Sequence, residues 1–373
     1  MKVLMMGWGY ENIISGGMDV HLTHLTKNLC KEGIEIHLFL PKDNAPNTAH
    51  PNLTIHKIDI NKYDDSTDMT SLIERYNNAI IKKSESLDFD IIHTHDWFGV
   101  LSAKKLAQER NKPWIHTVHS LEYMRCAKEH PSTTEIETIE KTGIKDSDAI
   151  ITVSNLMKKE ICHSYGTEPT KVNVIYNYTS ELPKNSEKIS RLDKIKNNPK
   201  VLCVSRLTFQ KGIEHIIHAS KTILKTVPDC RFIIIGDGHL KNSLIEFTKI
   251  LDVKDSFIFC GFIPQKELSY YFKNADVFVM PSIWEPFGIT CLDAIEFNIP
   301  VILSENVGAK ELFKDCVLTH KTRSTKDLAK KTLKLLKDKS YSDEQKNKAK
   351  KKLKSIDNWN TIAKKTICVY LSA

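Results

Sequence analysis

The sequence lacks a long apolar run, and this excludes a membrane-spanning protein. Its longest apolar runs have only the length of a strand, far short of the roughly eighteen residues that a membrane span needs. The apolar stretch at the amino terminus is too short for a signal peptide and leads directly into Gly7, so it is predicted to be a first strand. A cytoplasmic protein is therefore expected.

Cysteine pairs are also absent. The nine cysteines are dispersed singly along the chain, without a Cys-x-x-Cys motif. An odd and scattered set argues against a disulfide framework and against a zinc ribbon. Most of the cysteines are expected to be small core residues.

Arginine is scarce, which makes each arginine more informative. The net charge of +8 is carried overwhelmingly by lysine, with only seven arginines in 373 residues. Much of the excess lies at 326–354, above an apolar stripe of Leu328, Leu335 and Leu336. Two interpretations stay open: a solvated helical face, or a surface weakly attracted to an anionic partner such as a membrane. Aromatic residues do not interleave with the lysines, so nucleic acid is not expected as a partner.

Strand-length apolar runs alternate with helix-period segments along the whole chain, which is typical of parallel sheets built from βαβ units. In the first half the predicted strands are 2–7, 34–40, 53–58, 90–95, 114–119, 149–154 and 173–177. The polar segment 181–199 contains no convincing strand and is predicted to be a linker. In the second half the predicted strands are 200–205, 231–236, 256–261, 277–281, 300–304 and 316–319.

The predicted fold class is α/β, with two Rossmann-like doubly wound domains facing each other across a cleft. The first domain is expected at 1–180 and the second at 200–356. Ligands of such sheets bind beyond the carboxyl ends of the strands, so candidate site residues are sought there. The polar and glycine residues that follow strands are Gly7, Gly9, Gly16, Gly17, His95, Asp96, His119, Arg206, Gly236, Gly238, Gly261, Glu285 and Glu305.

Two of these positions suit a phosphate group. Gly16 and Gly17 precede a predicted helix, where backbone amides can approach a ligand and the helix end carries partial positive charge. Arg206 and Lys211 closely follow a strand, and an arginine fork with a lysine charge can clamp a leaving diphosphate. The alternatives are a simple turn and a surface pair. The Gly-Asp-Gly segment at Gly236 lacks the third glycine of a dinucleotide fingerprint, so no nicotinamide cofactor is predicted.

The segment 282–290 follows a buried strand and leads into a helix. Glu285 at the strand exit can hold a sugar hydroxyl. The backbone amides of Phe287, Gly288 and Ile289 at the helix start can hold an anion. Thr290, the next residue, is also predicted to bind the donor. The alternative is a capping carboxylate without a ligand.

The segment His93 to Asp96 contains residue types that bind metals. Strand alternation places His93 and His95 on the same face, but no further histidine or cysteine ligand is visible nearby in the sequence, so no metal site is predicted. Two Asp-x-Asp pairs, 88/90 and 146/148, precede their strands and are predicted to be solvated strand-entry residues. His119 ends a strand at the active edge, where a functional role is favoured over that of a half-buried structural histidine.

Together these segments resemble glycosyltransferase family 4, particularly its glycogen- and starch-synthase-like members, over nearly the whole chain. The similar segments are 7–10 with Ser15-Gly16-Gly17, the His-x-His-Asp-Trp segment 93–97, Ser-Arg-Leu at 205–207 with Lys-Gly at 211–212, and Glu-Pro-Phe-Gly at 285–288. Each motif alone is weak, whereas their order and spacing together are specific. The resemblance implies a GT-B fold, retention of anomeric configuration and no required metal.

The resemblance also implies roles for individual residues. Gly17 would contact the phosphates or sugar of the donor, and Arg206 and Lys211 would neutralise the departing diphosphate. His119 would lie against the donor sugar, and Glu285 would hold its hydroxyls. This makes the reaction one of positioning and leaving-group stabilisation.

Other residues are assigned by the same resemblance. Asp96 and Gly236 are assigned to donor binding, and the last helix, 357–371, would cross back to the first domain. Two departures from the family pattern stand out. Asp293 occupies the place of a glutamate that holds the nucleotide ribose, and Asn177-Tyr178 replaces a frequent Asn-Gly. Asp293 either reaches the ribose from a closer helix or alters the nucleotide preference.

Three hypotheses follow. The first is an α-glucan synthase-like enzyme that uses ADP- or UDP-glucose. The second is a transferase of the same fold with a lipid, sugar phosphate or protein as acceptor, for which the lysine-rich stretch would serve a membrane surface. The third is a sugar-nucleotide-binding protein without turnover, for which Asp293 is the only hint.

Overall fold

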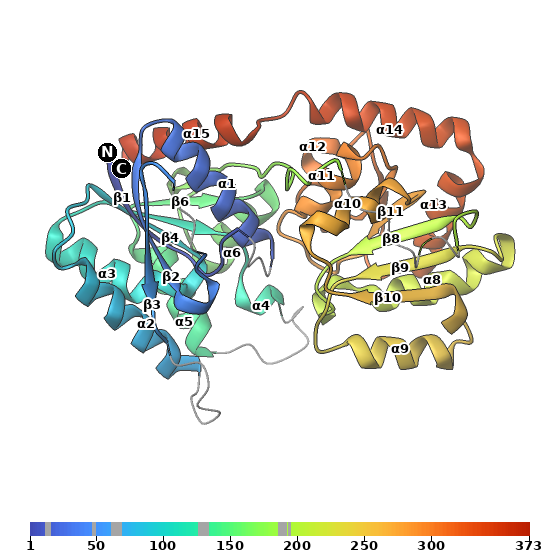
Figure 1. The fold of residues 1–373 in the computed structure, drawn as a ribbon, viewed down its shortest axis with the longest axis horizontal. Helices are drawn as coiled ribbons and strands as arrows, with labels where there is room; N and C mark the ends of the chain where they lie inside the picture. Colours follow the sequence, from blue (N-terminus) through green and yellow to red (C-terminus); the bar gives the residue numbers. More distant parts are fainter. Residues whose placement is uncertain (12–15, 47–49, 61–68, 126–133, 186–191, 193–194) are drawn as a thin grey trace. The chain divides into compact units, whose positions relative to one another are not determined.

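The computed structural model describes residues 1–11, 16–46, 50–60, 69–125, 134–185, 192 and 195–373. Ser15, Cys126, Arg191 and part of the segment 181–199 lie outside the described residues. The chain divides into two compact units, each with a sheet of its own (Figure 1). Unit 1 contains Met1–Asn177 together with Asp357–Ala373, and unit 2 contains Tyr178–Ile356.

Unit 1 is built on a seven-stranded parallel sheet. In spatial order its strands are β3 (Leu53–Ile58), β2 (Glu35–Pro41), β1 (Lys2–Met6), β4 (Ile91–His95), β5 (Trp114–Val118), β6 (Ala149–Thr152) and β7 (Val172–Val174). Its helices are α1 (Gly17–Lys31), α2 (Met69–Ser84), α3 (Val100–Arg110), α4 (Glu122–Arg125), α5 (Thr134–Asp146), α6 (Asn155–Tyr165) and α15 (Trp359–Ser372). Short 3-10 helices are η1 (Lys42–Asn44), η2 (Asp96–Gly99) and η3 (Pro169–Lys171). The strand order reverses between β1 and β4, which is where doubly wound sheets bind ligands.

Helices cover both faces of this sheet, and therefore its strands are apolar on both sides. Leu4 and Met6 of β1 pack into a core that α2, α3 and α5 complete. On the other face α1 lies beside α15 (Figure 1). Trp359 of α15 stacks on His24 of α1 with ring centroids 5.0 Å apart. The last helix of the chain thus packs within unit 1.

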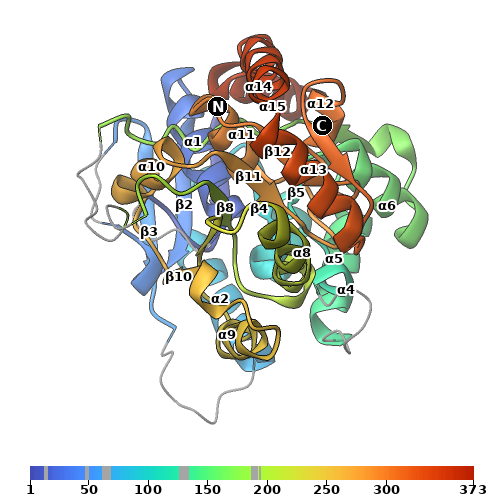
Figure 2. The same ribbon diagram turned by 90° about the vertical axis from the view of Figure 1, so that its right-hand side faces the viewer.

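Unit 2 repeats the design with six parallel strands. In spatial order they are β10 (Phe257–Gly261), β9 (Arg231–Ile235), β8 (Lys200–Val204), β11 (Val277–Met280), β12 (Val301–Ser304) and β13 (Leu318–His320). Its helices are α8 (Ile213–Thr226), α9 (Lys241–Ile250), α10 (Gln265–Lys273), α11 (Ile289–Glu296), α12 (Lys310–Phe313), α13 (Thr325–Lys337) and α14 (Lys339–Leu353), with the 3-10 helices η4 (Phe209–Lys211) and η5 (Lys254–Ser256). Figure 2 shows α8 and α13 side by side, and together with α9 they cover one core of the unit.

Every predicted strand has a counterpart in the two sheets. Most boundaries differ by one or two residues, at the start of some strands and at the end of others. The largest difference is at β7, which ends at Val174 although the prediction extended to 177. The fold class, two doubly wound α/β sheets, is as predicted.

The lysine-rich stretch forms α13 and α14. Leu328 and Leu335 are buried in the core of unit 2 and Leu336 packs against it, as the solvated-face interpretation predicts. The cysteine prediction holds only in part: Cys30, Cys203, Cys230 and Cys291 are buried, whereas Cys368 is exposed. Among the described residues, none of the helices combines the length and the apolar composition needed to cross a membrane.

Candidate active site

An ion pair lies at the carboxyl edge of the sheet in unit 2. The Nζ atom of Lys211 is 2.7 Å from Oε2 of Glu285, and the two side chains are only 10% and 13% exposed. Lys211 ends η4 after β8, and Glu285 follows β11. The amide of Ile283 donates to the carbonyl of Gln210 at 2.8 Å, which ties the two loops together. The sequence predicted both residues for the site but not their pairing.

The loop that carries Glu285 is fixed from several sides. The amide of Glu285 donates to the carbonyl of Asn306 at 3.0 Å, and Thr290 Oγ1 donates to the carbonyl of Val204 at 3.3 Å. Gly288 has a φ of 97°, and a Cβ there would lie 2.7 Å from Sδ of Met280. This position therefore requires glycine, and the carboxylate of Glu285 is held in one place.

Phe287 and Ile289 flank that glycine and are buried. The carbonyl of Phe287 accepts a hydrogen bond from the amide of Ala309 at 2.9 Å. Ile289 is the first residue of α11, which is eight residues long. Anion binding by the amides of this turn stays a prediction.

The loops after β8 and β9 touch each other through their backbones. Gly236 has a φ of 129°, and a Cβ there would lie 1.8 Å from the carbonyl oxygen of Ser205. The amide of Leu207 donates to the carbonyl of Asp237 at 2.8 Å. The glycine that seemed a weak dinucleotide signal is thus needed for this close approach. Arg206 lies in the same loop and is exposed.

Three buried polar atoms in these loops have no hydrogen-bond partner within the described chain. They are Oγ1 of Thr208, Oγ of Ser282 and Nε1 of Trp284. Buried donors of this kind are usually satisfied by a ligand or by water. The sequence analysis did not single out Thr208 or Ser282 for this.

An exposed aromatic ring lies at the same edge and was also missed. Phe262 directly follows β10 and is 65% exposed. Because β10 neighbours β9, Phe262 belongs to the same series of strand ends as Gly236 and Arg206. Its signal in the sequence was its place after a strand, next to Gly261. A flat exposed ring can stack on another flat ring, such as a nucleotide base.

Asp293 lies deep in unit 2, at 1% exposure on α11. One carboxylate oxygen accepts from the amide of Ser180 at 2.7 Å, and the other accepts from its hydroxyl at 2.8 Å. Burial raises the pKa of Asp293 to about 7, while the two bonds from Ser180 oppose the rise. Ribose binding by Asp293 stays a prediction, and it would require these bonds to rearrange.

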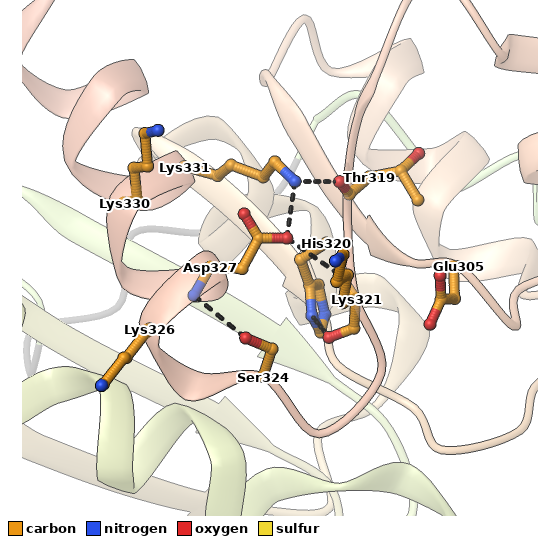
Figure 3. A pocket seen from close by; sticks show the side chains of 9 residues that line it. All are labelled: Glu305, Thr319, His320, Lys321, Ser324, Lys326, Asp327, Lys330 and Lys331. Carbon is orange, nitrogen blue, oxygen red and sulfur yellow. Dashed lines mark hydrogen bonds and ion pairs between the residues drawn. The ribbon is translucent and has the colours of Figure 1, made fainter.

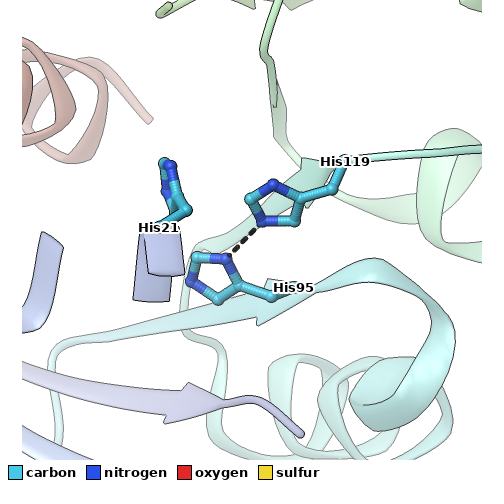
Figure 4. Close-up of side chains that lie close together, drawn as sticks. All are labelled: His21, His95 and His119. Atoms are coloured by element: carbon cyan, nitrogen blue, oxygen red, sulfur yellow. Dashed lines mark hydrogen bonds between the residues drawn. The ribbon is translucent and has the colours of Figure 1, made fainter. Parts of the chain in front are cut away.

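In unit 1 three histidines from three elements meet at the carboxyl edge of the sheet (Figure 4). His21 comes from α1, His95 ends β4 and His119 follows β5. Nδ1 of His95 lies 3.0 Å from Nε2 of His119. Burial lowers the pKa of His21 and of His119 to about 3 each, so both rings are neutral near pH 7.

Asp96 does not present a free carboxylate at this edge. Its Oδ1 accepts from the amides of His119 and Ser120 at 2.7 and 3.3 Å, and its Oδ2 lies 3.3 Å from Nη2 of Arg125. Asp96 has a φ of 50°, in the left-handed region that few non-glycine residues adopt and that aspartate tolerates better than most. In this structure Asp96 therefore positions His119, and a direct donor contact stays a prediction.

Arg125 joins two further carboxylates to this network. It lies 2.8 Å from Glu122 and 3.8 Å from Glu140. Burial raises the pKa of Glu140 to about 8, although the charge of Arg125 opposes the rise. The sequence analysis missed both Arg125 and Glu140, because neither follows a strand directly.

Gly16 and Gly17 lie at the amino end of α1, as predicted. Gly16 has an extended backbone, and nothing lies within 4 Å of the place where its Cβ would be. Phosphate binding at this helix end stays a prediction.

The Asp-x-Asp pairs lie at the opposite edge of the sheet in unit 1. Oδ2 of Asp90 accepts from the amide of Lys2 at 2.7 Å, and Oδ2 of Asp148 accepts from the amide of Trp114 at 2.7 Å. They join the starts of neighbouring strands, as strand-entry residues should.

A separate open hollow of about 560 Å³ lies at the end of β13 (Figure 3). Its lining is mostly charged and comprises Glu305, Thr319, His320, Lys321, Ser324, Lys326, Asp327, Lys330 and Lys331. Asp327 already accepts from Lys331 at 2.7 Å and from the amide of Lys321 at 2.9 Å. None of the residues predicted to bind the donor or to act in catalysis lines this hollow. Glu305, which does line it, was noted in the sequence only as a residue that follows a strand.

The two sheets define the class of protein. Two Rossmann-like parallel sheets flanked by helices, with polar residues at their carboxyl edges, constitute the GT-B architecture of glycosyltransferases. The family described as "Glycosyltransferase Family 4" matches residues 15–179, and the family described as "Glycosyl transferases group 1" matches residues 184–352. The chain belongs to these GT-B glycosyltransferases of family 4, which transfer sugars from nucleotide sugars.

Named relatives cover almost the whole chain. An uncharacterized glycosyltransferase of Methanocaldococcus jannaschii is 29% identical over 99% of this chain and 98% of its own length. A glycogen synthase of Mycobacterium tuberculosis is 26% identical over 100% of this chain and 95% of its own.

Solved structures agree with the fold. Sucrose-phosphate synthase from Thermosynechococcus elongatus superposes with a TM-score of 0.84 at 20% identity, covering 100% of this chain and 98% of its own. HepE from Anabaena, in complex with UDP-glucose, superposes with a TM-score of 0.79 at 16% identity, covering both chains fully.

Proposed function

We propose that the chain is a retaining hexosyltransferase that moves glucose from ADP- or UDP-glucose onto an α-glucan. The observation that carries the proposal is the buried pair of Lys211 and Glu285, 2.7 Å apart, together with the exposed Arg206, which follows β8 as Lys211 does. The pair offers a carboxylate for sugar hydroxyls next to a cation for a phosphate. The similarity to a glycogen synthase and to a protein that binds UDP-glucose supports glucose as the sugar.

The roles follow from the charges. Arg206 and Lys211 neutralise the negative charge that grows on the nucleoside diphosphate as the bond between its oxygen and the sugar C1 breaks. The acceptor hydroxyl forms the new bond to C1 on the same face, and its proton passes to the departing phosphate oxygen. Glu285 holds the sugar hydroxyls, and Lys211 is then shared between Glu285 and the phosphate.

Unit 2 offers further groups for the donor. Phe262 stacks on the base, because its ring is exposed at the series of strand ends that carries Arg206. The buried Thr208 hydroxyl and Trp284 Nε1 donate hydrogen bonds to oxygens of the sugar or phosphate. No metal is required for this scheme, since two side-chain cations take the place that a divalent ion has elsewhere.

Unit 1 contributes by hydrogen bonding rather than by charge. His119 is neutral near pH 7 and contacts a hydroxyl of the donor sugar, held in place by Asp96. Gly17 contacts the donor phosphates or sugar at the amino end of α1.

The test is nucleotide release from a panel of ADP-, UDP- and GDP-sugars, with and without an α-glucan primer and with a chelator present. We expect release from one glucose donor, only when primer is present, with an α-linkage in the product by NMR. Release that requires a lipid vesicle or a sugar phosphate instead would replace the glucan acceptor. Binding without release from any donor would contradict turnover.

A further inference from the structure

A buried set of ring nitrogens lies at the edge of unit 1, and the proposed transfer uses only one of its three rings, that of His119. His21, His95 and His119 each have one nitrogen within 4.8 Å of the other two (Figure 4). Their exposures are 1%, 0% and 7%. Among the described residues, this is the one place where the fold brings together three or more side chains that could bind a metal ion. Buried polar atoms normally have hydrogen-bond partners, and two nitrogens of this group, Nε2 of His21 and Nε2 of His95, have none in the described chain.

The hydrogen bond to His21 decides which of its nitrogens is available. Nδ1 of His21 lies 2.6 Å from Oδ1 of Asn177. An amide oxygen only accepts, so Nδ1 carries the proton and Nε2 has a bare lone pair. Nε2 is buried and has no partner in the described chain. A histidine whose outer nitrogen donates to an oxygen, and whose inner nitrogen is bare, is the usual arrangement of a metal ligand.

The other two rings face each other. Nδ1 of His95 and Nε2 of His119 are 3.0 Å apart and share one proton, while Nε2 of His95 is buried without a partner. Binding of an ion would move the shared proton to the far nitrogen of its own ring. All three ligands then stay neutral and no proton is lost.

We propose that His21, His95 and His119 form a binding site for one zinc-type divalent ion, with the fourth position open to water. A tetrahedral ion with bonds of about 2.0–2.1 Å to nitrogen needs ligand atoms about 3.4 Å apart. The nitrogens of His95 and His119, 3.0 Å apart, would have to separate by about 0.4 Å, and the third nitrogen, from His21, lies within 4.8 Å of both. Imidazole ligands favour zinc, copper or nickel over magnesium, which prefers oxygen.

The site and the proposed transfer compete for the same ring. An ion bound to Nε2 of His119 takes up the nitrogen that faces His95, and it fixes the ring toward His21. Binding of the ion itself does not rest on the proposed function, because it is measured without any nucleotide sugar.

The experiment is a titration of chelator-treated, metal-free protein with Zn²⁺, followed by calorimetry and by metal analysis after desalting. We expect one ion per chain and an increase in melting temperature. His21→Gln and His95→Gln should each lower the affinity by more than the roughly 10- to 100-fold that loss of an outer hydrogen bond costs. Mg²⁺ should give no heat above dilution.

The matched control is His56→Gln. His56 pairs with His37 at 3.0 Å in the same unit, but this pair lacks a third ring. Zinc affinity should be unchanged in this variant. Stoichiometric binding that survives in both cluster variants, or no binding to the unaltered protein, would overturn the proposal.

A second measurement needs no substitution in the buried cluster. Co²⁺ added to the unaltered protein should give the strong visible bands of a four-coordinate nitrogen site, which Zn²⁺ then abolishes. A thiolate charge-transfer band in the near ultraviolet would place the ion on cysteines, and so would contradict the histidine site.

Discussion

The carboxyl edges of the two sheets carry different side chains on the same topology. In unit 1 the strand ends carry histidines that are buried and neutral near pH 7, with Asp96 and Arg125 closed into a network of their own. In unit 2 the strand ends carry a buried ion pair and the exposed Arg206. Neutral rings can donate and accept hydrogen bonds without attracting charge, whereas cations stabilise a departing diphosphate.

This difference shows that the topology of the sheet does not determine which side chains lie at its carboxyl edge. Both sheets reverse their strand order after the first strand of the unit, and both offer the same edge to a ligand. What differs is the side chains of the loops that follow the strands. Under the proposed function, stabilisation of the departing diphosphate should therefore be sensitive to changes in unit 2, and recognition of sugar hydroxyls to changes in unit 1.

The largest expected effect is that of Glu285→Gln. The amide keeps the size of the side chain but leaves Lys211 without its charge partner, and it loses the carboxylate that holds the sugar. We expect turnover to fall by about 100- to 1,000-fold, with a much smaller change in nucleotide affinity. Steady-state kinetics and calorimetry with the nucleoside diphosphate measure the two effects.

The control for this variant is Glu305→Gln, a carboxylate that also follows a strand of unit 2. Its Oε1 accepts only from the amide of Thr322 among the bonds described, at 2.9 Å. It should retain turnover. Undiminished turnover in Glu285→Gln would remove Glu285 from the mechanism.

Arg206→Ala comes next. Loss of the guanidinium removes one of two cations beside the leaving group, so we expect turnover to fall by about 100-fold. Arg231→Ala is the control, because Arg231 starts β9 at the opposite edge of the same sheet. If both variants lose the same activity, the effect is one of stability or net charge and not of the leaving group.

A change of pH should separate the two units in stability. His21 and His119 have pKa values of about 3 when folded, below the usual value of 6.5. As the pH falls below 6.5, these histidines bind protons in the unfolded chain but not in folded unit 1. The free energy of unfolding of unit 1 therefore decreases by about 1 kcal/mol per pH unit for each such ring. Asp293 has the opposite effect on stability as the pH falls. Its folded pKa is about 7, so between pH 7 and 4 folded unit 2 keeps a proton that the unfolded chain has released.

Hydrogen exchange at pH 7 and pH 5, corrected for intrinsic rates, measures this. Peptides of β4 and β5 should lose protection relative to those of α11. Glu140, with a pKa of about 8, partly offsets the loss in unit 1. Asp293→Asn should abolish the gain in unit 2. Equal changes in both units would show that the buried histidines do not remain neutral.

The smallest expected effect is that of Phe262→Ala. Loss of a stacked ring should weaken binding of the nucleotide by roughly 10-fold and leave turnover at saturation nearly unchanged. Ile250→Ala is the matched control, since Ile250 is an apolar side chain of unit 2 that is 77% exposed. A fall in turnover without a change in nucleotide affinity would contradict a stacking role.

Much of the fold was predictable because strands in covered parallel sheets leave a local pattern. Residues 2–7 and 200–205 are short, mostly apolar runs that precede polar loops. They correspond to strands β1 and β8. The candidate residues at strand ends were predictable for the same reason, since chain direction alone puts them at one edge. His21 and Arg125 follow no strand, and nothing in their neighbourhood marked them.

The sequence by itself determined the two-sheet class, the active edge and the chemical types at that edge, because these depend on periodicity and order along the chain. Only the tertiary structure decided the pairs. Lys211 meets Glu285, His21 meets Asn177, and Asp293 meets Ser180, across separations of 74, 156 and 113 residues. Hydrogen bonds and ion pairs need distances of about 3 Å, and spacing along the chain does not specify such distances between separate elements.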